Sequence, residues 1–415
     1  MKRIIFHIDV NSAYLSWESV WRIQHGATID LRNIPSVVGG DPKNRSGIIL
    51  AKSIPAKERG VKTGETLYSA FEKCKDLVVV PPNYSLYVKC SDAMNTIFRE
   101  YTPKVQRYSV DESFLDVTGT ENIWGNPIKL AYIIKERIKK ELGFTVSVGI
   151  SENKLLAKMA SDMKKPDGVT TIFKKDIKTK MWHLDVGELF MVGRRTLNKL
   201  HNLGIETIGD LANFDLEVLR YKLKSHGEMI YRYANGIEDS EVRKSNRLDI
   251  KGIGNSTTTS FDIDNKNEAL MVLLSLCETV GMRLRDAKYI TSLISVSIKT
   301  SEFVKYSHQQ KIFTPTDSTN IIYEYAKKLF NEMWKGENIR HIGVRVSEFS
   351  DNDIIQLNMI HRNNEKMKKL DKVIDSIRTK YDSNAIVRGC FIGSDIKPLT
   401  GGTHDGDYPV MSSIL

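Results

Sequence analysis

Cysteine is scarce in this sequence of 415 residues, and its four copies lie far apart. No two of them form a CxxC pair, which argues against a zinc site and against a disulfide framework. The same scarcity favours a reducing cytoplasm as the compartment. The four positions are Cys74, Cys90, Cys277 and Cys390.

Long apolar runs are also absent. None approaches the roughly 18 consecutive residues that a membrane-spanning helix needs, so we expect no membrane segment. The first residues enter a strand-like pattern at once, without the charged and apolar regions of a signal peptide. A chain of 415 residues is long enough for about two to four domains.

Acidic residues are outnumbered, with 51 Asp and Glu against 61 Lys and Arg, for a net charge of +10. The excess is local: residues 129–180 carry 13 basic and 6 acidic side chains, whereas residues 351–415 carry 9 of each. A confined positive field suits a surface that contacts a phosphate backbone. A lysine-rich helical face turned to solvent would produce the same count.

Strand and helix patterns alternate over the first 165 residues. This alternation predicts an α+β fold, with a central sheet and helices on one of its faces. The predicted strands are residues 3–10, residues 108–118 (or two arms of a hairpin) and residues 144–151; the predicted helices are residues 84–101, 126–143 and 153–168.

The remainder of the chain changes character twice. We expect residues 168–240 to be mainly helical and residues 245–349 to mix strands with two helices, separated by a polar, basic linker. The two helices are predicted at residues 266–286 and 317–334, the linker at residues 243–252, and one more helix near residues 363–380 of a polar tail.

Three acids occur in strand-like runs, Asp9 in "RIIFHIDVNSAY" and the adjacent Asp111 and Glu112 in "YSVDESFLDVTG". Two divalent cations would compensate such acids, because Mg²⁺ prefers hard oxygen ligands and a pair of ions can assist phosphoryl transfer. Neighbouring residues of a strand point to opposite faces, so Asp111 and Glu112 can serve together only at a strand end or bend. The simpler interpretation is a strand-end cap and a solvated turn.

The segments around these acids, with "VGISENKLLAKMASDMKKPDG" at residues 148–168, resemble the motifs of Y-family translesion DNA polymerases in order and separation. The bacterial DNA polymerase IV and UmuC-like branches are the most similar. The resemblance covers about residues 2–350. It implies a palm (residues 1–20 and 77–166), fingers (21–76), a thumb (167–242), the linker (243–252), a little finger (253–350) and a C-terminal tail (351–415).

The resemblance also implies individual roles. Asp9, Asp111 and Glu112 would be the catalytic acids and, with the Val10 carbonyl, would hold two Mg²⁺ ions, for which Mn²⁺ can substitute. Tyr14 stands where the family keeps an aromatic steric gate, a ring that leaves no room for a ribose 2′-OH; a core aromatic is the alternative.

Two further positions concern the incoming nucleotide. Lys165 matches a basic residue that contacts the triphosphate, although a lysine at a helix C-terminus also suits the dipole. In the fingers-like segment "GIILAKSIPAKERGVKTGE", Ile54 stands where the family often has a phosphate-touching tyrosine, and Lys57 where it often has arginine. Lysine keeps the charge but loses the bidentate fork.

Residues 186–212 resemble a helix-hairpin-helix, whose backbone N–H groups hold DNA phosphates without reading sequence. Leu197 and Leu200 would pack inward, Gly204 would make the turn, and Gly193 would contact DNA. The family usually has glycine at both ends of the hairpin, but the first of these positions is Met191 here. A plain helical hairpin is the alternative.

The C-terminal region would complete the grip on DNA. Lys299, Lys305 and Arg345 are predicted phosphate contacts of the little finger, against the alternative of a solvated surface. Beyond it, "QLNMI" resembles the short peptide by which bacterial polymerases dock on the sliding clamp, or it is simply a strand. Its proposed anchors are Gln356, Leu357, Met359 and Ile360.

We therefore expect a monomeric, template-directed DNA polymerase that transfers nucleotides from dNTP to a primer 3′-OH during damage tolerance. Two other classes stay open. A nucleotide cyclase or metal-dependent nuclease could use similar acids but would not need the hairpin and the basic C-terminal domain. A non-catalytic DNA-binding repair accessory factor would keep the basic surfaces and would not need the acids.

Overall fold

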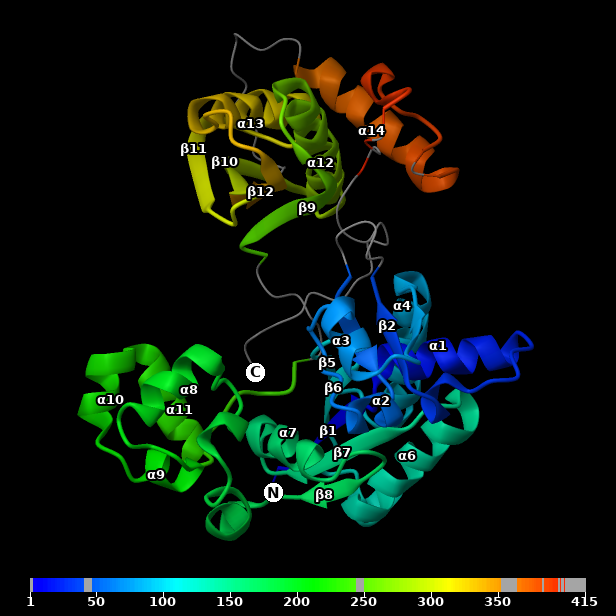
Figure 1. The fold of residues 1–415 in the computed structure, drawn as a ribbon. Coiled ribbons are helices and arrows are strands. Elements are labelled where there is room, and N and C mark those ends of the chain that lie inside the picture. The colour runs from blue at the N-terminus through cyan, green and yellow to red at the C-terminus, as the bar shows by residue number, and fades with distance from the viewer. Residues whose placement is uncertain are drawn as a thin grey trace. The chain divides into compact units, whose positions relative to one another are not determined.

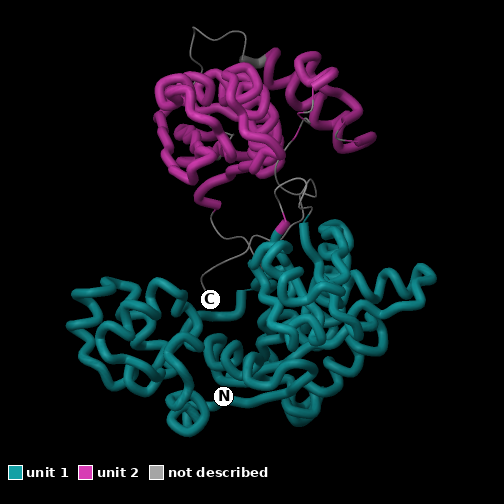
Figure 2. The backbone as a smooth tube through the Cα atoms, viewed as in Figure 1, with its two compact units in different colours: residues 1–40, 48–246, 407–415 teal, residues 41–47, 247–406 magenta. Residues whose placement is uncertain are grey.

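The computed structural model describes residues 3–40, 47–243, 250–351, 364–382, 384–394, 396 and 399. They form two compact units (Figure 2). The first contains residues 3–40 and 48–243, and the second contains residues 250–351 and the described residues after 363. Within these ranges, no helix has the length and apolarity that crossing a membrane demands.

A five-stranded sheet in the order β5-β6-β1-β7-β8 organises the first unit (Figure 1). β1 is central and runs antiparallel to both of its neighbours, β6 and β7. Every residue of β1 is buried, as the apolar run predicts. The strands are β1 (Ile5–Val10), β5 (Val105–Arg107), β6 (Glu112–Asp116), β7 (Val146–Ser151) and β8 (Val169–Thr171).

Helices cover both faces of this sheet, so the prediction of helices on one face was wrong. On one face Ile5 packs in a cluster with Leu155 of α7 (Lys154–Met163). On the other face Phe6 packs in a cluster with Phe98 and Ile134. Those two residues belong to α4 (Tyr84–Tyr101) and α6 (Pro127–Leu142). The physical reason is that successive strand residues point to opposite faces, and in β1 both sets are apolar.

Local signals set the helix boundaries. The Asn126 side chain accepts a hydrogen bond from the Ile128 N–H, Pro127 occupies the first turn, and Gly143 ends α6 with φ 77°, all as predicted. β7 and α7 approach so closely that a Cβ on Gly149 would lie 1.9 Å from the Ala157 carbonyl oxygen. That contact fixes α7 against the strand beside β1.

A smaller sheet in the order β3-β2-β4 forms a separate part of the first unit, with its own core around Val37, Ile49 and Leu67. Its strands are β2 (Ser36–Gly39), β3 (Ile49–Lys52) and β4 (Val78–Val80). α1 (Ala13–Gln24) leads into it from β1, and α2 (Ile54–Glu58) and α3 (Leu67–Lys73) belong to it.

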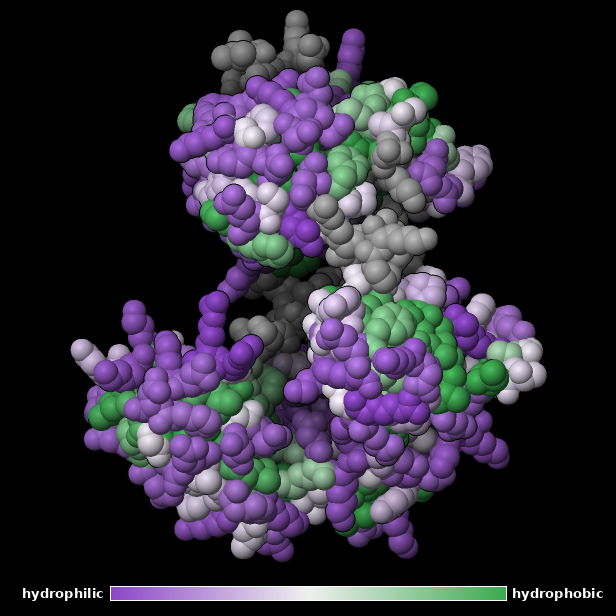
Figure 3. Space-filling model, in the orientation of Figure 1, coloured by the Kyte–Doolittle hydropathy of each residue, from purple (hydrophilic) through white to green (hydrophobic). Residues whose placement is uncertain are grey.

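Four short helices follow the five-stranded sheet: α8 (Arg194–His201), α9 (Ile208–Ala212), α10 (Leu216–Leu223) and α11 (Ser225–Ala234). Leu200 is fully buried and Leu197 packs beside it, as predicted. Their outer surface is mainly hydrophilic in the view of Figure 3. The prediction of a mainly helical segment here is confirmed.

The second unit is a four-stranded antiparallel sheet in the order β11-β10-β12-β9. Its strands are β9 (Gly252–Ile263), β10 (Tyr289–Thr300), β11 (Lys305–Thr316) and β12 (Ile339–Asp351). Ile294, Val296 and Ile298 share a core with α12 (Lys266–Asp286) and α13 (Thr319–Met333). Both predicted helices are therefore present.

The predicted helix of the tail is α14 (Asn364–Lys380), and charged residues attach it to this unit. Arg378 and Arg388 both contact Glu278 of α12, at 3.3 Å and 2.7 Å. Arg285 of α12 contacts Asp375 of α14 at 2.5 Å. Glu278 and Arg378 are almost fully buried, so these charges satisfy one another away from water.

Candidate active site

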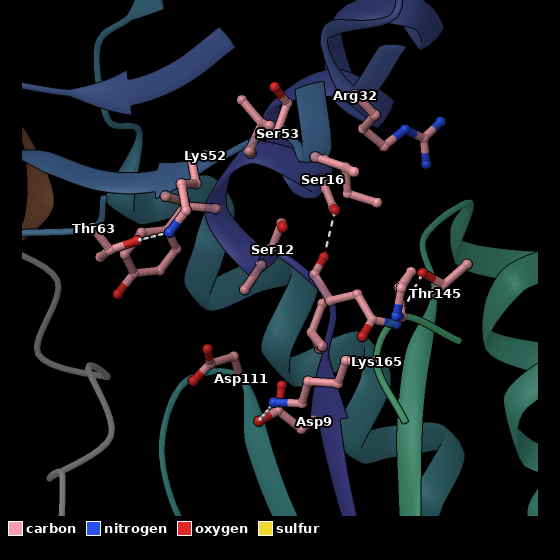
Figure 4. A pocket seen from close by; sticks show the side chains of 18 of the residues that line it. Asp9, Ser12, Ser16, Arg32, Lys52, Ser53, Thr63, Asp111, Thr145 and Lys165 are labelled. Atoms are coloured by element: carbon pink, nitrogen blue, oxygen red, sulfur yellow. Dashed lines mark hydrogen bonds and ion pairs between the residues drawn. The ribbon is translucent and has the colours of Figure 1, made fainter. Parts of the chain in front are cut away.

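A cavity of about 690 Å³ opens at the end of β1, between the two sheets of the first unit (Figure 4). Seven residues singled out from the sequence line it together, and they come from five different segments. They are Asp9, Val10, Tyr14, Ile54, Lys57, Asp111 and Lys165. The sequence therefore identified seven of the 22 residues that line this cavity.

Asp9 is the penultimate residue of β1 and is 7% exposed. Its carboxylate lies 2.9 Å from the Lys165 ammonium, and both groups appear at the bottom of the cavity in Figure 4. Burial, together with the charges of Glu112 and Asp111, raises the pKa of Asp9 to about 8, against the opposing charge of Lys165. A carboxyl group in this setting gains strongly from a nearby cation.

Asp111 occupies a bend immediately before β6, and Glu112 is the first residue of that strand. The predicted requirement of a strand end or bend is met. The Val10 N–H donates to the Asp111 carbonyl at 3.1 Å, which holds the bend against the end of β1. Burial, assisted by the charge of Glu112, raises the pKa of Asp111, although Ser109 donates a hydrogen bond to its carboxylate.

Glu112 pairs with Asp9 across the two strands, so both side chains leave the same face of the sheet. Its carboxylate lies 2.6 Å from the ammonium of Lys158 on α7 and 3.7 Å from Nε2 of His7. Although burial opposes it, His7 and the charge of Lys158 hold the pKa of Glu112 below its usual range. Burial and Lys158 lower the pKa of His7, which favours a neutral ring.

These acids supply the hard oxygen donors that a divalent cation prefers. Within the described ranges, no three His, Cys, Asp or Glu side chains lie close enough together to form a metal centre. Instead a lysine ammonium contacts each of the two cross-strand acids, Lys165 at Asp9 and Lys158 at Glu112. Each of these acids therefore already has a positive charge beside it, as it would have with a bound divalent cation. The carboxylate oxygens are of the type that such an ion binds.

Tyr14, in the first turn of α1, lines the cavity and belongs to an aromatic cluster. Its ring stacks on Tyr87 with a centroid distance of 4.5 Å and an interplanar angle of 10°. It also meets Tyr84 edge-on at 6.4 Å and Trp17 at 6.0 Å. The ring therefore both lines the cavity and packs against other aromatic rings, and its role as a steric gate stays a prediction.

In the hairpin before α8, the residue that replaces the expected glycine has a left-handed backbone conformation. Met191 adopts φ 75°, a left-handed conformation that favours glycine. Gly193 is the N-cap of α8, and nothing lies within 4 Å of where its Cβ would be. Gly204 has φ 76° and makes the predicted turn between α8 and α9.

Lys299, Lys305 and Arg345 lie on one face of the second unit's sheet. Lys299 pairs with Lys305 across β10 and β11. In the same strand β10, Ser295 pairs with Arg345. Residues 295 and 299 share a strand face, opposite the buried Ile294, Val296 and Ile298 that meet the helices. The basic residues therefore gather on the face away from α12 and α13.

The proposed clamp-binding residues Gln356, Leu357, Met359 and Ile360 lie outside the described residues. Three residues were not predicted from the sequence: Lys52, which lines the cavity, and His7 and Lys158, which contact Glu112. A helical spacing signal was available for the last of these, because positions 158, 161, 162 and 165 fall on one face of a helix. Lys52, the last residue of β3, gave no signal, since nothing in the sequence distinguishes it from the other lysines.

Family models match three segments of the chain. The model "impB/mucB/samB family" matches residues 8–162 and its C-terminal domain model matches residues 250–359. A model described as "DNA polymerase-iota, thumb domain" matches residues 188–238. Together these segments include most of the cavity lining, the four short helices and the four-stranded sheet.

Curated relatives span nearly the whole chain. DNA polymerase IV of Clostridium acetobutylicum is 49% identical over 403 residues, covering 96% of this chain and 100% of that protein. DNA polymerase IV 2 of Bacillus subtilis is 37% identical, covering 93% and 94% respectively. Among solved structures, a Y-family DNA polymerase chimera of Dbh and Dpo4 has the same fold, with a TM-score of 0.71, 23% identity and coverage of 86% of this chain and 100% of that one.

Proposed function

Because the chain belongs to the Y family of DNA polymerases and synthesises DNA on a template in damage tolerance, we propose that this reaction takes place in the cavity at the end of β1. The observation that carries the assignment is the meeting of Asp9 and Asp111 with Tyr14, Lys57 and Lys165 around one space. In the reaction the primer 3′-OH attacks the α-phosphorus of a dNTP, and the bond to pyrophosphate breaks.

Divalent metal dependence is general in this family, and we propose two Mg²⁺ ions, with Mn²⁺ as a substitute. Asp9, Asp111 and Glu112, with the Val10 carbonyl, would hold them. When bound, such ions lower the pKa of the attacking hydroxyl and neutralise charge on the leaving phosphates. The chain's own contribution is to fix the carboxylates on the ends of two paired strands, where burial already favours a cation beside them.

The lysines and Tyr14 would position the nucleotide. Lys57 reaches the cavity from α2 and Lys165 from the segment after α7, so they can neutralise the triphosphate from two different segments. The ring of Tyr14 is held by its stack on Tyr87 and would restrict the space beside the sugar C2′. Selection of deoxyribose is then steric rather than by hydrogen bonding.

Grip on the duplex would come from elsewhere in the chain. Gly193 and Gly204 belong to the hairpin segment before and after α8, and Lys299, Lys305 and Arg345 share one sheet face. Contacts of this kind bind phosphates without reading bases, so binding should weaken steeply with salt. The palm, fingers, thumb, linker and little finger are proposed with the boundaries predicted from the sequence.

Three further proposals concern the cellular setting. The segment "QLNMI" would dock on the sliding clamp, the chain would act as a monomer, and its compartment would be the reducing cytoplasm. Free thiols at all four cysteines agree with the last of these.

Primer extension by the full chain, with and without Mg²⁺, tests the assignment. Asp111→Asn should abolish extension, because it removes a carboxylate charge without changing size. The matched control is Asp116→Asn: Asp116 is a buried acid at the end of β6, it pairs with Lys104 at 3.3 Å, and it does not line the cavity. Equal activity of the two variants would exclude the proposed site.

A further inference from the structure

The fingers wall of the cavity, which we define as Lys52, Ile54, Lys57 and Thr63, carries two positive charges that form no ion pair within the described residues. Lys52 ends β3 and Lys57 lies in α2, and both line the cavity. Among the described residues neither lysine ammonium forms an ion pair with a carboxylate, in contrast to Lys158 and Lys165. Burial, and then the charge of Lys57, lowers the pKa of Lys52.

Glu65, whose charge opposes the lowering of the Lys52 pKa, makes its direct contacts with other groups. Glu65 forms an ion pair with Lys73 and accepts the Lys62 N–H at 2.7 Å. Arg32, another cation of the lining, is likewise engaged, because Asp30 lies 2.8 Å from its guanidinium. The unbalanced charge is therefore specific to Lys52 and Lys57. Two like charges at one wall disfavour each other unless an anion lies between them.

Lys52 is also held in place. Its ammonium donates to the Thr63 hydroxyl at 3.1 Å, as Figure 4 shows, and its backbone is paired with Val37 in the sheet. This one hydrogen bond leaves two of the three ammonium protons for a ligand. A side chain that is fixed before the ligand arrives loses less entropy on binding.

Ile54 explains why such a group is needed. It occupies the first turn of α2 and is 47% exposed, and its side chain offers no hydrogen-bond donor. A tyrosine there, as the family resemblance implies, would offer a hydroxyl to the phosphates. Here the same wall presents an apolar side chain, with an unpaired ammonium two residues earlier in the sequence.

We propose that Lys52 binds the triphosphate of the incoming nucleotide and supplies the contact that Ile54 cannot make. With Lys57 and Lys165 it makes three cations, from three segments, around a space lined on its other side by Asp9 and Asp111. Four negative charges on a triphosphate match this set better than a monophosphate does. The inference depends on the proposed polymerase function of the same cavity.

The test measures dNTP binding by the full chain on a primer–template whose primer ends in a dideoxynucleotide, so that no turnover occurs. Lys52→Met should raise the dNTP dissociation constant about 10-fold or more, the effect of losing a charge-assisted hydrogen bond. Binding of the corresponding deoxynucleoside, which lacks phosphates, should not change. The control is Lys62→Met, an exposed lysine that does not line the cavity, and it should bind dNTP as the unmodified chain does.

Two more variants separate phosphate contact from a structural effect. Lys52→Arg should retain most of the affinity, and Ile54→Tyr added to Lys52→Met should restore a substantial part of it. Unchanged affinity in Lys52→Met, equal weakening of the nucleoside, or no restoration by Ile54→Tyr would each overturn the proposal. If the unmodified chain does not extend primers at all, the proposed function fails instead, which is a distinguishable result.

Discussion

The palm wall of the cavity, which we define as Asp9, Val10 and Asp111, differs from the fingers wall in burial and in its agreement with the family motifs. On the palm wall Asp9 is buried on the paired strand β1, and Asp111 is largely buried in the bend whose carbonyl accepts the Val10 N–H; the motifs around both follow the family pattern. On the fingers wall Ile54 and Lys57 are exposed and depart from that pattern. Metal ligation requires oxygens at fixed positions. Neutralising phosphate does not, because charge acts over longer distances and from many directions.

The largest expected effect is on kcat/KM, and it is tested by comparing a substitution on the palm wall with one on the fingers wall. Asp9→Asn should lower kcat/KM of primer extension by a factor on the order of 10³, since it removes several kcal/mol of transition-state stabilisation. Lys57→Met should lower it only about 10-fold, mainly through KM for dNTP. Steady-state kinetics of both variants measures the difference. If the two variants lost kcat/KM to a similar extent, the two walls would not differ in their contribution to catalysis.

The acids near the palm wall could be predicted from the sequence for a physical reason. Asp9, Asp111 and Glu112 stand in apolar strand runs, where an acid is conspicuous, and strand ends that pair must bring such acids together. Asn126, Pro127 and Gly143 likewise act within one turn of their own positions. Local rules of this kind need no knowledge of the rest of the fold.

The contacts of Lys52 on the fingers wall and of Lys158 with Glu112 could not be predicted from the sequence, because they depend on segments that are brought together only by the fold. Lys52 and Thr63 meet only because β3 and the following loop fold back on each other, and the pair has no periodic signature. Lys158 reaches Glu112 from a helix 46 residues later. Whether helices would cover one sheet face or both also depended on distant segments, and the sequence prediction on that point was wrong.

The helix α7 carries a buried lysine, whereas Lys57 of the fingers wall is exposed. Lys154 of α7 has a fully buried side chain, and burial lowers its pKa to about 8, from an ordinary value of 10.5. Between these pH values the unfolded chain binds more protons than the folded chain, so the free energy of unfolding should rise with pH. The contribution should amount to about 3 kcal/mol.

Denaturant titrations at pH 7 to 10.5 would test this contribution by comparing the unmodified chain with Lys154→Met. The difference in unfolding free energy between the two should shift in favour of the unmodified chain as pH rises. Lys154→Arg, which cannot lose its charge in this range, should show no such gain. Parallel pH curves for the unmodified chain and Lys154→Met would contradict burial of an ionisable lysine here.

A smaller effect is expected for the aromatic that faces the nucleotide from α1. Tyr14→Ala should reduce the preference for dNTP over rNTP by about 10- to 200-fold, the range for steric discrimination in a pocket. Tyr14→Phe keeps the ring and should leave the preference unchanged. Because the variant also loses its stack on Tyr87, the ratio of kcat/KM for the two sugars is the appropriate measurement. An unaltered ratio in Tyr14→Ala would remove the gate role.

The smallest effect extends the comparison to the helical hairpin, which also departs from the family pattern at one residue. Met191 holds φ 75° where glycine would be unstrained, and its side chain is half-buried in the neighbouring core. Met191→Gly and Met191→Ala lose nearly the same side-chain contacts, but only glycine relieves the left-handed strain. Met191→Gly should therefore be more stable than Met191→Ala by about 1 kcal/mol in urea unfolding. The reverse order would mean that residue 191 adopts a backbone conformation other than the left-handed one in the variants.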